Sequence, residues 1–217
     1  MNLEQARFNM IEQQLRPWDV LDQKVLDLLY VVKREEFVPP AYRLLAFSDT
    51  EVPLGHGAAM LPPKIEARAL QALKIGKSER VLEIGTGSGY MAALLAAHAA
   101  QVVSVEIVPE LAELAEANLK RCGVNNVIVA TGDGSQGWPA QAPYDVILVS
   151  GALPEVPQPL LDQLKTGGRL LAFVGEAPLM ETQLITRIDQ HNFKSEILFE
   201  TLVPPLTCAQ AAQRFSF

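Results

Sequence analysis

The chain has 217 residues, which is enough for one well-buried domain with terminal additions and too few for two independent cores. Its net charge of −7 and pI of about 5.0 lack the basic excess that neutralises phosphates, so we expect no nucleic-acid partner. Hydrophobic residues make up 49% and charged residues 20%, which is typical of a globular protein and argues against a disordered block.

Two helices are predicted at the N-terminus. Apolar residues recur at helical spacing over residues 3–15, and Pro17 ends the pattern. A second helix is predicted over residues 22–32, because Asp22 suits the N-cap position. Residues 34–63 are rich in Pro and Gly but also apolar, so we expect a long, ordered and functional loop.

From Pro63 onward the chain repeats one unit, an apolar run followed by a loop and a helix. Pro63 itself suits the first turn of a helix that continues to about residue 73. Apolar strands are predicted over residues 81–84, 102–107, 127–130, 146–150 and 170–174. Helices are predicted over residues 90–99, 109–123 and 159–164. Fully apolar strands that alternate with helices indicate a doubly wound α/β fold with a mostly parallel sheet.

The C-terminal part has a different pattern. Residues 182–188 and 194–202 alternate between apolar and polar side chains and are joined through His191-Asn192. This pattern predicts an antiparallel hairpin at the edge of the sheet. We expect one structural unit, in which N-terminal helices and a loop (residues 1–63) pack on an α/β domain (residues 64–217).

A glycine-rich turn follows the first predicted strand of the sheet. In such a fold the ligand binds at the carboxyl ends of the strands, where the winding reverses. There the sequence reads Gly85-Thr86-Gly87-Ser88-Gly89, whose missing Cβ atoms let the backbone approach a ligand. Glu106, followed by Ile107, ends the second strand about 20 positions later, where a carboxylate can accept hydrogen bonds from both ribose hydroxyls. After the third strand, Gly132-Asp133-Gly134 offers a carboxylate and backbone N–H groups for adenine.

Tyr90 decides between two nucleotide-like ligands. A dinucleotide fingerprint has a third glycine at this position, so Tyr90 argues against a pyrophosphate. S-adenosylmethionine carries no phosphate and needs only the glycine turn, with an acidic group such as Glu83 to orient water or its amino group. Each feature alone is common in structural turns and caps, but Glu83, the glycine turn, Glu106 and Asp133 in this order predict an S-adenosylmethionine site.

Other conspicuous residues are interpreted as structural. His98 lies in an Ala-rich helix and His191 in a turn, while Tyr90 and Met91 are expected in the core, where Tyr90 could also cover the cofactor. Cys122 and Cys208 lie far apart with no histidine nearby, so neither a zinc site nor a disulfide framework is predicted.

The N-terminus and the most apolar stretch give the expected compartment. Residues 1–16 are too polar for a signal peptide, and the most apolar stretch, residues 90–105, is interrupted by polar side chains. We therefore expect a cytoplasmic protein with reduced thiols, no metal and no membrane anchor.

Several stretches resemble the protein-L-isoaspartate O-methyltransferase family. They are VLEIGTGSGY, the Val105-Glu106 pair, NNVIVATGDGSQGWPAQAPYD, Leu153-Pro154-Glu155-Val156-Pro157 and QLKTGGRLLAFVGE. Weaker similarity extends over nearly the whole chain. The resemblance implies a Rossmann-like class I methyltransferase that transfers a methyl group from S-adenosylmethionine to a protein or peptide carboxylate, an activity of protein repair.

One segment departs from that family. Its pattern Pro-x-Gly-x-Gly-Gln-Thr-Ile-Ser-x-Pro begins here at Pro53, and the Gln, Thr and Ser are replaced by Ala58, Ala59 and Leu61. In the family the Thr and Ser hydroxyls lie between the methyl donor and the isoaspartyl carboxylate. The resemblance therefore assigns the acceptor side to Pro53, Gly57, Ala59, Met60 and Leu61, and no catalytic residue stands at the serine position, Leu61.

The sequence leaves three functions open for this protein. His56 is a weak candidate for a replacement polar group, since a lone histidine in a glycine-rich loop is more often a surface residue. The full-length resemblance favours an isoaspartyl-type methyltransferase, although Ala59 and Leu61 are expected to lower its activity on isoaspartyl peptides. The same apolar side chains favour a methyltransferase for a small uncharged molecule, or a module that binds S-adenosylmethionine without turnover.

Overall fold

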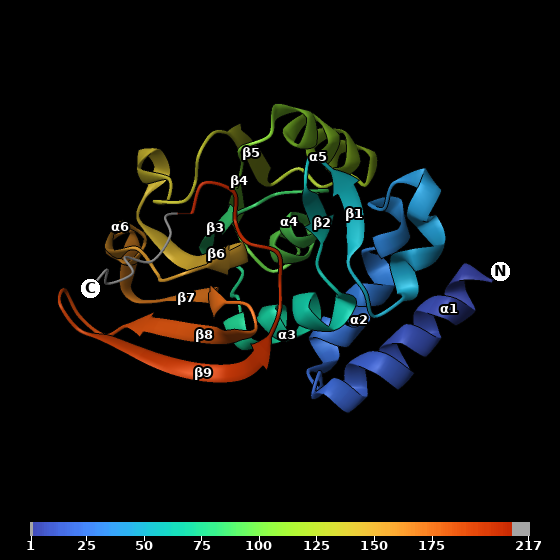
Figure 1. Cartoon of the computed structure of the whole chain (residues 1–217), viewed down its shortest axis with the longest axis horizontal. Helices are drawn as coiled ribbons and strands as arrows, with labels where there is room; N and C mark the ends of the chain where they lie inside the picture. Colours follow the sequence, from blue (N-terminus) through green and yellow to red (C-terminus); the bar gives the residue numbers. More distant parts are fainter. Residues whose placement is uncertain (1, 210–217) are drawn as a thin grey trace.

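A computed structural model describes residues 2–209, and in them seven strands form one sheet in the order β5-β4-β3-β6-β7-β8-β9 (Figure 1). The strands are β3 (Arg80–Ile84), β4 (Gln101–Glu106), β5 (Val127–Thr131), β6 (Tyr144–Leu153), β7 (Leu164–Glu176), β8 (Leu179–Arg187) and β9 (Phe193–Thr201). The first five pair in parallel, whereas β7–β8 and β8–β9 pair antiparallel. The predicted mostly parallel sheet with an antiparallel edge hairpin is confirmed.

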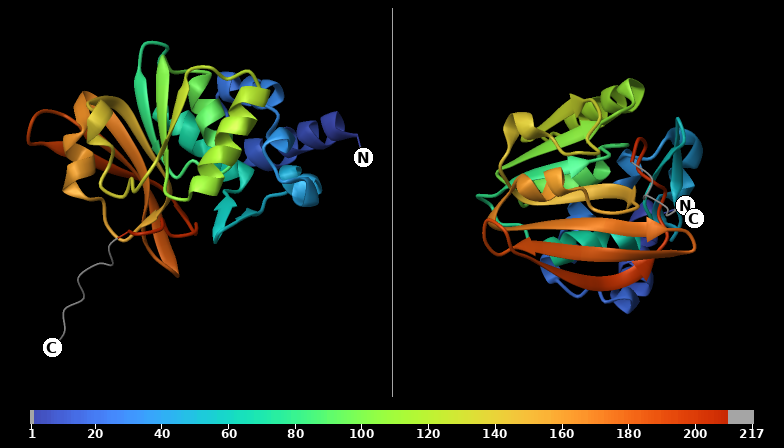
Figure 2. Two further views of the ribbon diagram at one scale, coloured as in Figure 1. Left: turned by 90° about the horizontal axis from the view of Figure 1, so that it is seen from above. Right: turned by 60° about the vertical axis from the view of Figure 1, so that its left-hand side comes forward.

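Helices cover the two faces of the sheet unequally (Figure 2). They are α1 (Leu3–Met10), α2 (Gln23–Val31), α3 (Pro63–Leu73), α4 (Tyr90–Ala96), α5 (Pro109–Arg121) and α6 (Gln158–Asp162). Val81 and Val102 share a buried cluster with residues of α1 to α5, so these helices pack on one face. Leu82 and Val103 belong to a second buried cluster, on the opposite face, which also contains Leu160 of α6. None of the helices in residues 2–209 combines the length and apolarity that crossing a membrane requires.

Several predicted helices are shorter than expected; the one predicted over residues 90–99, for example, ends at Ala96. The N-terminal helix ends at Met10 and continues as a π-helical turn, Ile11–Leu15, before Pro17. The helix predicted over 159–164 ends at Asp162, because the backbone oxygen of Gln163 accepts a hydrogen bond from the amide of Tyr144 (2.8 Å). Residue 164 therefore begins β7 instead of extending α6.

The long loop over residues 34–63 contains a hairpin that was not predicted. Strands β1 (Val52–Gly55) and β2 (Ala58–Met60) pair antiparallel around the turn residues His56 and Gly57. Both turn residues have positive φ, 54° and 78°, as a two-residue hairpin turn requires. The usual sequence signal for such a turn is Asn-Gly or Asp-Gly. His-Gly between short apolar runs lacks this signal, so the hairpin was not predicted.

Two chain segments meet above the carboxyl ends of the central strands. The winding reverses between β3 and β6, which is the switch point of the sheet. The segment after β9, red in Figure 1, returns to β6, where the amide of Ala152 donates to the oxygen of Pro204 and the amide of Leu206 donates to the oxygen of Ala152, both at 2.8 Å. The C-terminal segment thereby forms one wall of the switch point, and the β1–β2 hairpin forms another.

Candidate functional site

Two adjoining cavities lie at the switch point. The outer cavity encloses ≈ 670 Å³ including its open mouth, within the range of small-molecule sites. It is lined by strand ends and their loops (Ile84, Gly85, Gly87, Val105, Glu106, Ile107, Gly132, Asp133, Gly134, Ser135, Ser150, Gly151), by the hairpin (Gly57, Ala58, Ala59, Leu61) and by the C-terminal segment (Pro204, Pro205, Leu206, Thr207). The inner cavity shares five of these residues and extends toward α3 and α4; its lining is Leu54, Ala59, Met60, Leu61, Glu66, Gly85, Thr86, Gly87, Ser88, Tyr90, Met91 and Ser150.

The glycines of the turn have two different roles: two of them line the cavities, and one allows two helices to pack closely. Gly85, Gly87 and Gly89 all have positive φ, so the turn requires glycine at each position. Gly85 and Gly87 line both cavities. Gly89 lines neither, and a Cβ there would meet the backbone of Ala115 in α5 at 3.3 Å. Gly89, predicted to bind the cofactor, is therefore placed where α4 packs on α5.

Glu106 is a buried carboxylate held in a fixed orientation. Its Oε2 accepts a hydrogen bond from the amide of Gly87 (2.8 Å) and its Oε1 accepts one from the amide of Val108 (3.1 Å). Each carboxylate oxygen has a second lone pair, so both can still accept from a ligand hydroxyl. With Ile107 beside it in the outer cavity, Glu106 has the position and capacity to hold a vicinal diol such as ribose.

Asp133 has an exposed position in the same cavity. Its Oδ1 accepts from the amide of Ser135 (2.8 Å), and within residues 2–209 its Oδ2 accepts no hydrogen bond. Beside it, a Cβ on Gly134 would lie 3.0 Å from Ile84 and 3.2 Å from Val105, so glycine keeps this wall flat. A flat apolar wall with one free carboxylate oxygen suits an adenine ring and its amine.

Glu83 does not reach either cavity. It is fully buried, its Oε2 accepts from Oγ of Ser104 (2.6 Å), and its Oε1 accepts from Oγ of Ser150 (3.3 Å). Burial raises the pKa of Glu83 to about 8, although both serine hydrogen bonds lower it. Glu83 was predicted to orient bound water or the amino group of the ligand, but it lies beneath the turn, and Ser150, its hydrogen-bond partner, lines the cavities instead.

A carboxylate that the sequence analysis overlooked lines the inner cavity instead. Glu66 of α3 is 4% exposed, and its Oε2 accepts a hydrogen bond from Nε of Arg34 (3.0 Å). Arg34 is itself buried and donates further to the backbone oxygens of Leu61 (2.6 Å) and Ala46 (3.2 Å). Burial raises the pKa of Glu66 to about 7, against the lowering effect of Arg34. The sequence signal was an acidic residue within the apolar face of α3.

The hairpin brings some of the predicted acceptor-side residues to the cavities and not others. Ala59 and Leu61 line both cavities, and Gly57 lines the outer one. Pro53 and His56 line neither, and His56 is exposed at the tip of the turn. The positive φ of His56 turns the chain at this point, so its side chain is not brought to the site.

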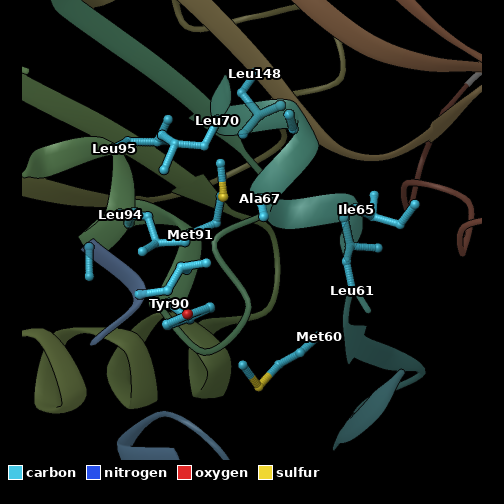
Figure 3. Close-up of a cluster of buried hydrophobic side chains, with 14 of the residues drawn as sticks. Met60, Leu61, Ile65, Ala67, Leu70, Tyr90, Met91, Leu94, Leu95 and Leu148 are labelled. Carbon is cyan, nitrogen blue, oxygen red and sulfur yellow. The ribbon is translucent and has the colours of Figure 1, made fainter. Parts of the chain in front are cut away.

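Tyr90 and Met91 serve packing and also face the inner cavity. Figure 3 shows them on α4 opposite the segment that carries Met60 and Leu61. The Tyr90 ring lies 5.4 Å from that of Phe37, and both side chains are buried. Tyr90 therefore combines the core role and the cavity-lining role that its position suggested.

The remaining histidines lie outside this arrangement. His98 follows α4 and His191 lies in the β8–β9 turn, and neither lines the two cavities. In the part of the chain that the structure describes, no three His, Cys, Asp or Glu side chains gather as a metal ion would need. The site thus offers carboxylates, hydroxyls and backbone amides for an organic ligand.

Comparison with known sequences identifies relatives over most of the chain. Residues 6–210 match the family described as protein-L-isoaspartate(D-aspartate) O-methyltransferase. A protein-L-isoaspartate O-methyltransferase from Methanoculleus marisnigri is 49% identical over 169 residues, which cover 78% of this chain and 77% of the relative. One from Opitutus terrae is 43% identical over 205 residues, covering 93% of this chain and 86% of the relative.

Solved structures give the same picture of the fold. A protein-L-isoaspartate O-methyltransferase superposes with a TM-score of 0.80 at 29% identity, covering 94% of this chain and 67% of that one. A chain from Plasmodium falciparum, solved in complex with S-adenosyl-L-homocysteine, has a TM-score of 0.76 at 22% identity, covering 95% and 99%. At that identity the second similarity concerns the fold alone.

Proposed function

The chain belongs to the protein-L-isoaspartate(D-aspartate) O-methyltransferase family, and from this membership we propose that it is an S-adenosylmethionine-dependent methyltransferase acting on peptide or protein carboxylates, isoaspartyl carboxylates among them. The observation that carries the donor assignment is Glu106, buried at the switch point and fixed by the amides of Gly87 and Val108. Its free lone pairs match the two hydroxyls of a ribose.

The residues of the outer cavity fit the adenosine part of the donor. Glu106 accepts the ribose hydroxyls, Asp133 accepts the adenine amine, and Gly134 leaves room for the ring. Gly85 and Gly87 let the backbone approach the remainder of the ligand. The donor supplies a methyl group bonded to a positively charged sulfur.

Carboxyl methylation sets modest demands on the acceptor side. An oxygen of the ionised carboxylate forms a bond to the methyl carbon as the carbon–sulfur bond breaks, and the bonding electrons leave with the sulfur. No proton has to be removed, so the protein must align and desolvate the acceptor and needs no general base. Leu61 at the position of the family serine is compatible with such a reaction.

The direct test is transfer of a labelled methyl group to a peptide. We expect label in a peptide that contains L-isoaspartate and none in the same peptide with L-aspartate. The label should be lost in mild base, because a methyl ester hydrolyses there and a methylated amine does not. Label that survives base would contradict a carboxylate acceptor.

One observation favours a second function. Ala59 and Leu61 present apolar side chains to both cavities, which suits a small uncharged acceptor. A panel of metabolites in the same assay distinguishes this alternative. Donor binding without transfer to any peptide, metabolite or protein of a cell extract would support a non-catalytic module.

A further inference from the structure

We propose that Glu66 binds the α-ammonium group of the methyl donor, the role that the sequence analysis gave to Glu83. The inference rests on the proposed function, because it takes S-adenosylmethionine as the donor. It adds a binding residue on α3, outside the strand ends and the glycine turn that make up the predicted donor site.

Glu83 is separated from the ligand cavities by its serine partners. Both of its carboxylate oxygens accept hydrogen bonds from serines, and its side chain is fully buried beneath the turn. An ammonium group in either cavity would meet the Ser150 hydroxyl before it met Glu83. A neutral hydroxyl offers a cation less compensation for its lost water than a carboxylate does, so a carboxylate that reaches the cavity would bind the ammonium better.

Glu66 lies at the inner cavity and has one oxygen available for a ligand. Among residues 2–209 that line the inner cavity, Glu66 is the only one with an acidic side chain. Its Oε2 is occupied by Nε of Arg34, while its Oε1 accepts no hydrogen bond within the described residues. One oxygen is therefore held by a buried cation and the other is left to meet a ligand.

The two adjoining cavities suit the two ends of the ligand. Glu106 lines only the outer cavity and Glu66 only the inner one, and Gly85 and Gly87 line both. A nucleoside whose ribose lies at Glu106 would pass its 5′ substituent across the two glycines into the inner cavity. In S-adenosylmethionine that substituent ends in an amino acid, whose cation would then lie beside Glu66.

The experiment compares two ligands that differ in the amino-acid end. S-adenosylhomocysteine carries it, whereas 5′-methylthioadenosine ends in a methyl thioether. Calorimetry on the full chain should show that Glu66→Gln weakens S-adenosylhomocysteine binding roughly tenfold to hundredfold, the range for a hydrogen bond to a charged group. Binding of 5′-methylthioadenosine should change less than about twofold, because it lacks the ammonium. Glu116→Gln, an exposed change on α5, is the matched control and should affect neither ligand.

A second pair of measurements covers the case in which Glu66→Gln leaves Arg34 unpaired and the protein does not fold. Glu66→Asp keeps the charge beside Arg34 but shortens the reach, and it should also weaken only S-adenosylhomocysteine. The unmodified chain should bind the deamino analogue of S-adenosylhomocysteine at least about tenfold more weakly than the parent ligand.

The outcomes separate this inference from the proposed function. Equal loss for both ligands, or full affinity of a folded Glu66 variant for S-adenosylhomocysteine, would overturn the role of Glu66. Equal binding of the parent and deamino ligands would overturn it as well. If the unmodified chain bound neither adenosine ligand, the donor assignment itself would fail.

Discussion

The amide of Gly87 donates to Oε2 of Glu106 over 2.8 Å, which ties the glycine turn after β3 to the end of β4. The same carboxylate accepts from the amide of Val108, the N-cap residue of α5. Glu106 thus positions the turn and keeps lone pairs for a ligand, so its loss is expected to affect both.

Glu106→Ala should weaken donor binding more than Asp133→Ala. Glu106 is placed to accept two ribose hydrogen bonds, and each bond to a charged acceptor is worth about 1.5 to 3 kcal/mol, whereas Asp133 is exposed and is placed to accept one bond. Calorimetry with S-adenosylhomocysteine measures both variants. Unchanged affinity in a folded Glu106→Ala protein would remove the basis for placing ribose there. The affinity of Glu106→Gln should lie between those of the unmodified chain and Glu106→Ala.

S-adenosylmethionine and S-adenosylhomocysteine should raise the melting temperature, and NAD should not. A ligand that binds only the native state at one hundred times its dissociation constant adds about 2.7 kcal/mol to the free energy of unfolding. Tyr90 stands where the dinucleotide fingerprint has its third glycine, the one that allows close packing of helix on strand, so that fingerprint is incomplete here. Stabilisation by NAD alone would reverse the cofactor assignment.

The sequence predicted the sheet well because its strands are apolar on both faces and its glycine turn is local. The order Glu83, glycine turn, Glu106 and Asp133 follows from strand ends, and the structure brings Glu106 and Asp133 to one cavity. The depth of Glu83 was not predictable, since Ser104 and Ser150, on two other strands, cover its two oxygens.

Residues far apart in the sequence were the hardest to assign. Glu66 lines the inner cavity, where it accepts a hydrogen bond from Arg34, 32 positions away in the sequence. The C-terminal segment forms a wall of the outer cavity because Ala152 forms backbone hydrogen bonds with Pro204 and Leu206. No local sequence pattern predicts this contact. Residues 210–217, part of the expected α/β domain, lie outside the described residues.

Glu83→Gln should flatten the loss of stability as the pH rises. The pKa of Glu83 is raised from 4.5 in the unfolded chain to about 8 in the fold, so between these values the native state holds a proton that the unfolded state has lost. Stability therefore falls with rising pH in this window, by up to about 1.4 kcal/mol per pH unit for one group. Urea unfolding from pH 5 to 8 should give a shallower slope for the variant. Equal slopes for both proteins would contradict a neutral Glu83.

The affinity for S-adenosylhomocysteine should rise between pH 6 and pH 8, while that for 5′-methylthioadenosine should stay level. The pKa of Glu66 is about 7 in the free protein, and an ammonium ligand favours its ionised form, so binding releases a proton. Arg34 opposes this rise in the pKa of Glu66. Burial raises the pKa of the nearby Tyr90 phenol, which therefore stays neutral over this pH range.

Glu83 is the other group near Glu66 that titrates in this range, so the control is Glu66→Gln. That variant should abolish the pH dependence of S-adenosylhomocysteine binding if Glu66 causes it. A dependence that persists in Glu66→Gln and disappears in Glu83→Gln would assign the proton to Glu83 instead.

The apolar acceptor side should limit turnover and leave donor binding intact. The unmodified chain should methylate an isoaspartyl peptide slowly although it binds the donor normally, and Ala59→Thr with Leu61→Ser should raise the rate. Each unsatisfied polar group costs roughly 1 to 3 kcal/mol, so two of them would correspond to a rate lower by about ten- to ten-thousand-fold.

The double variant Ala59→Thr, Leu61→Ser needs a control for its effect on packing. Leu61 is buried against the core, so its truncation opens space as well as adding a hydroxyl. Leu61→Ala combined with Ala59→Val removes similar bulk and adds similar branching without hydroxyls, and it should not raise the rate. If the unmodified chain already methylates the peptide as fast as the hydroxyl variant, other groups hold the acceptor carboxylate. Thr207 and the hairpin residues Gly57 and Ala58, which line the outer cavity, would then be the next to test.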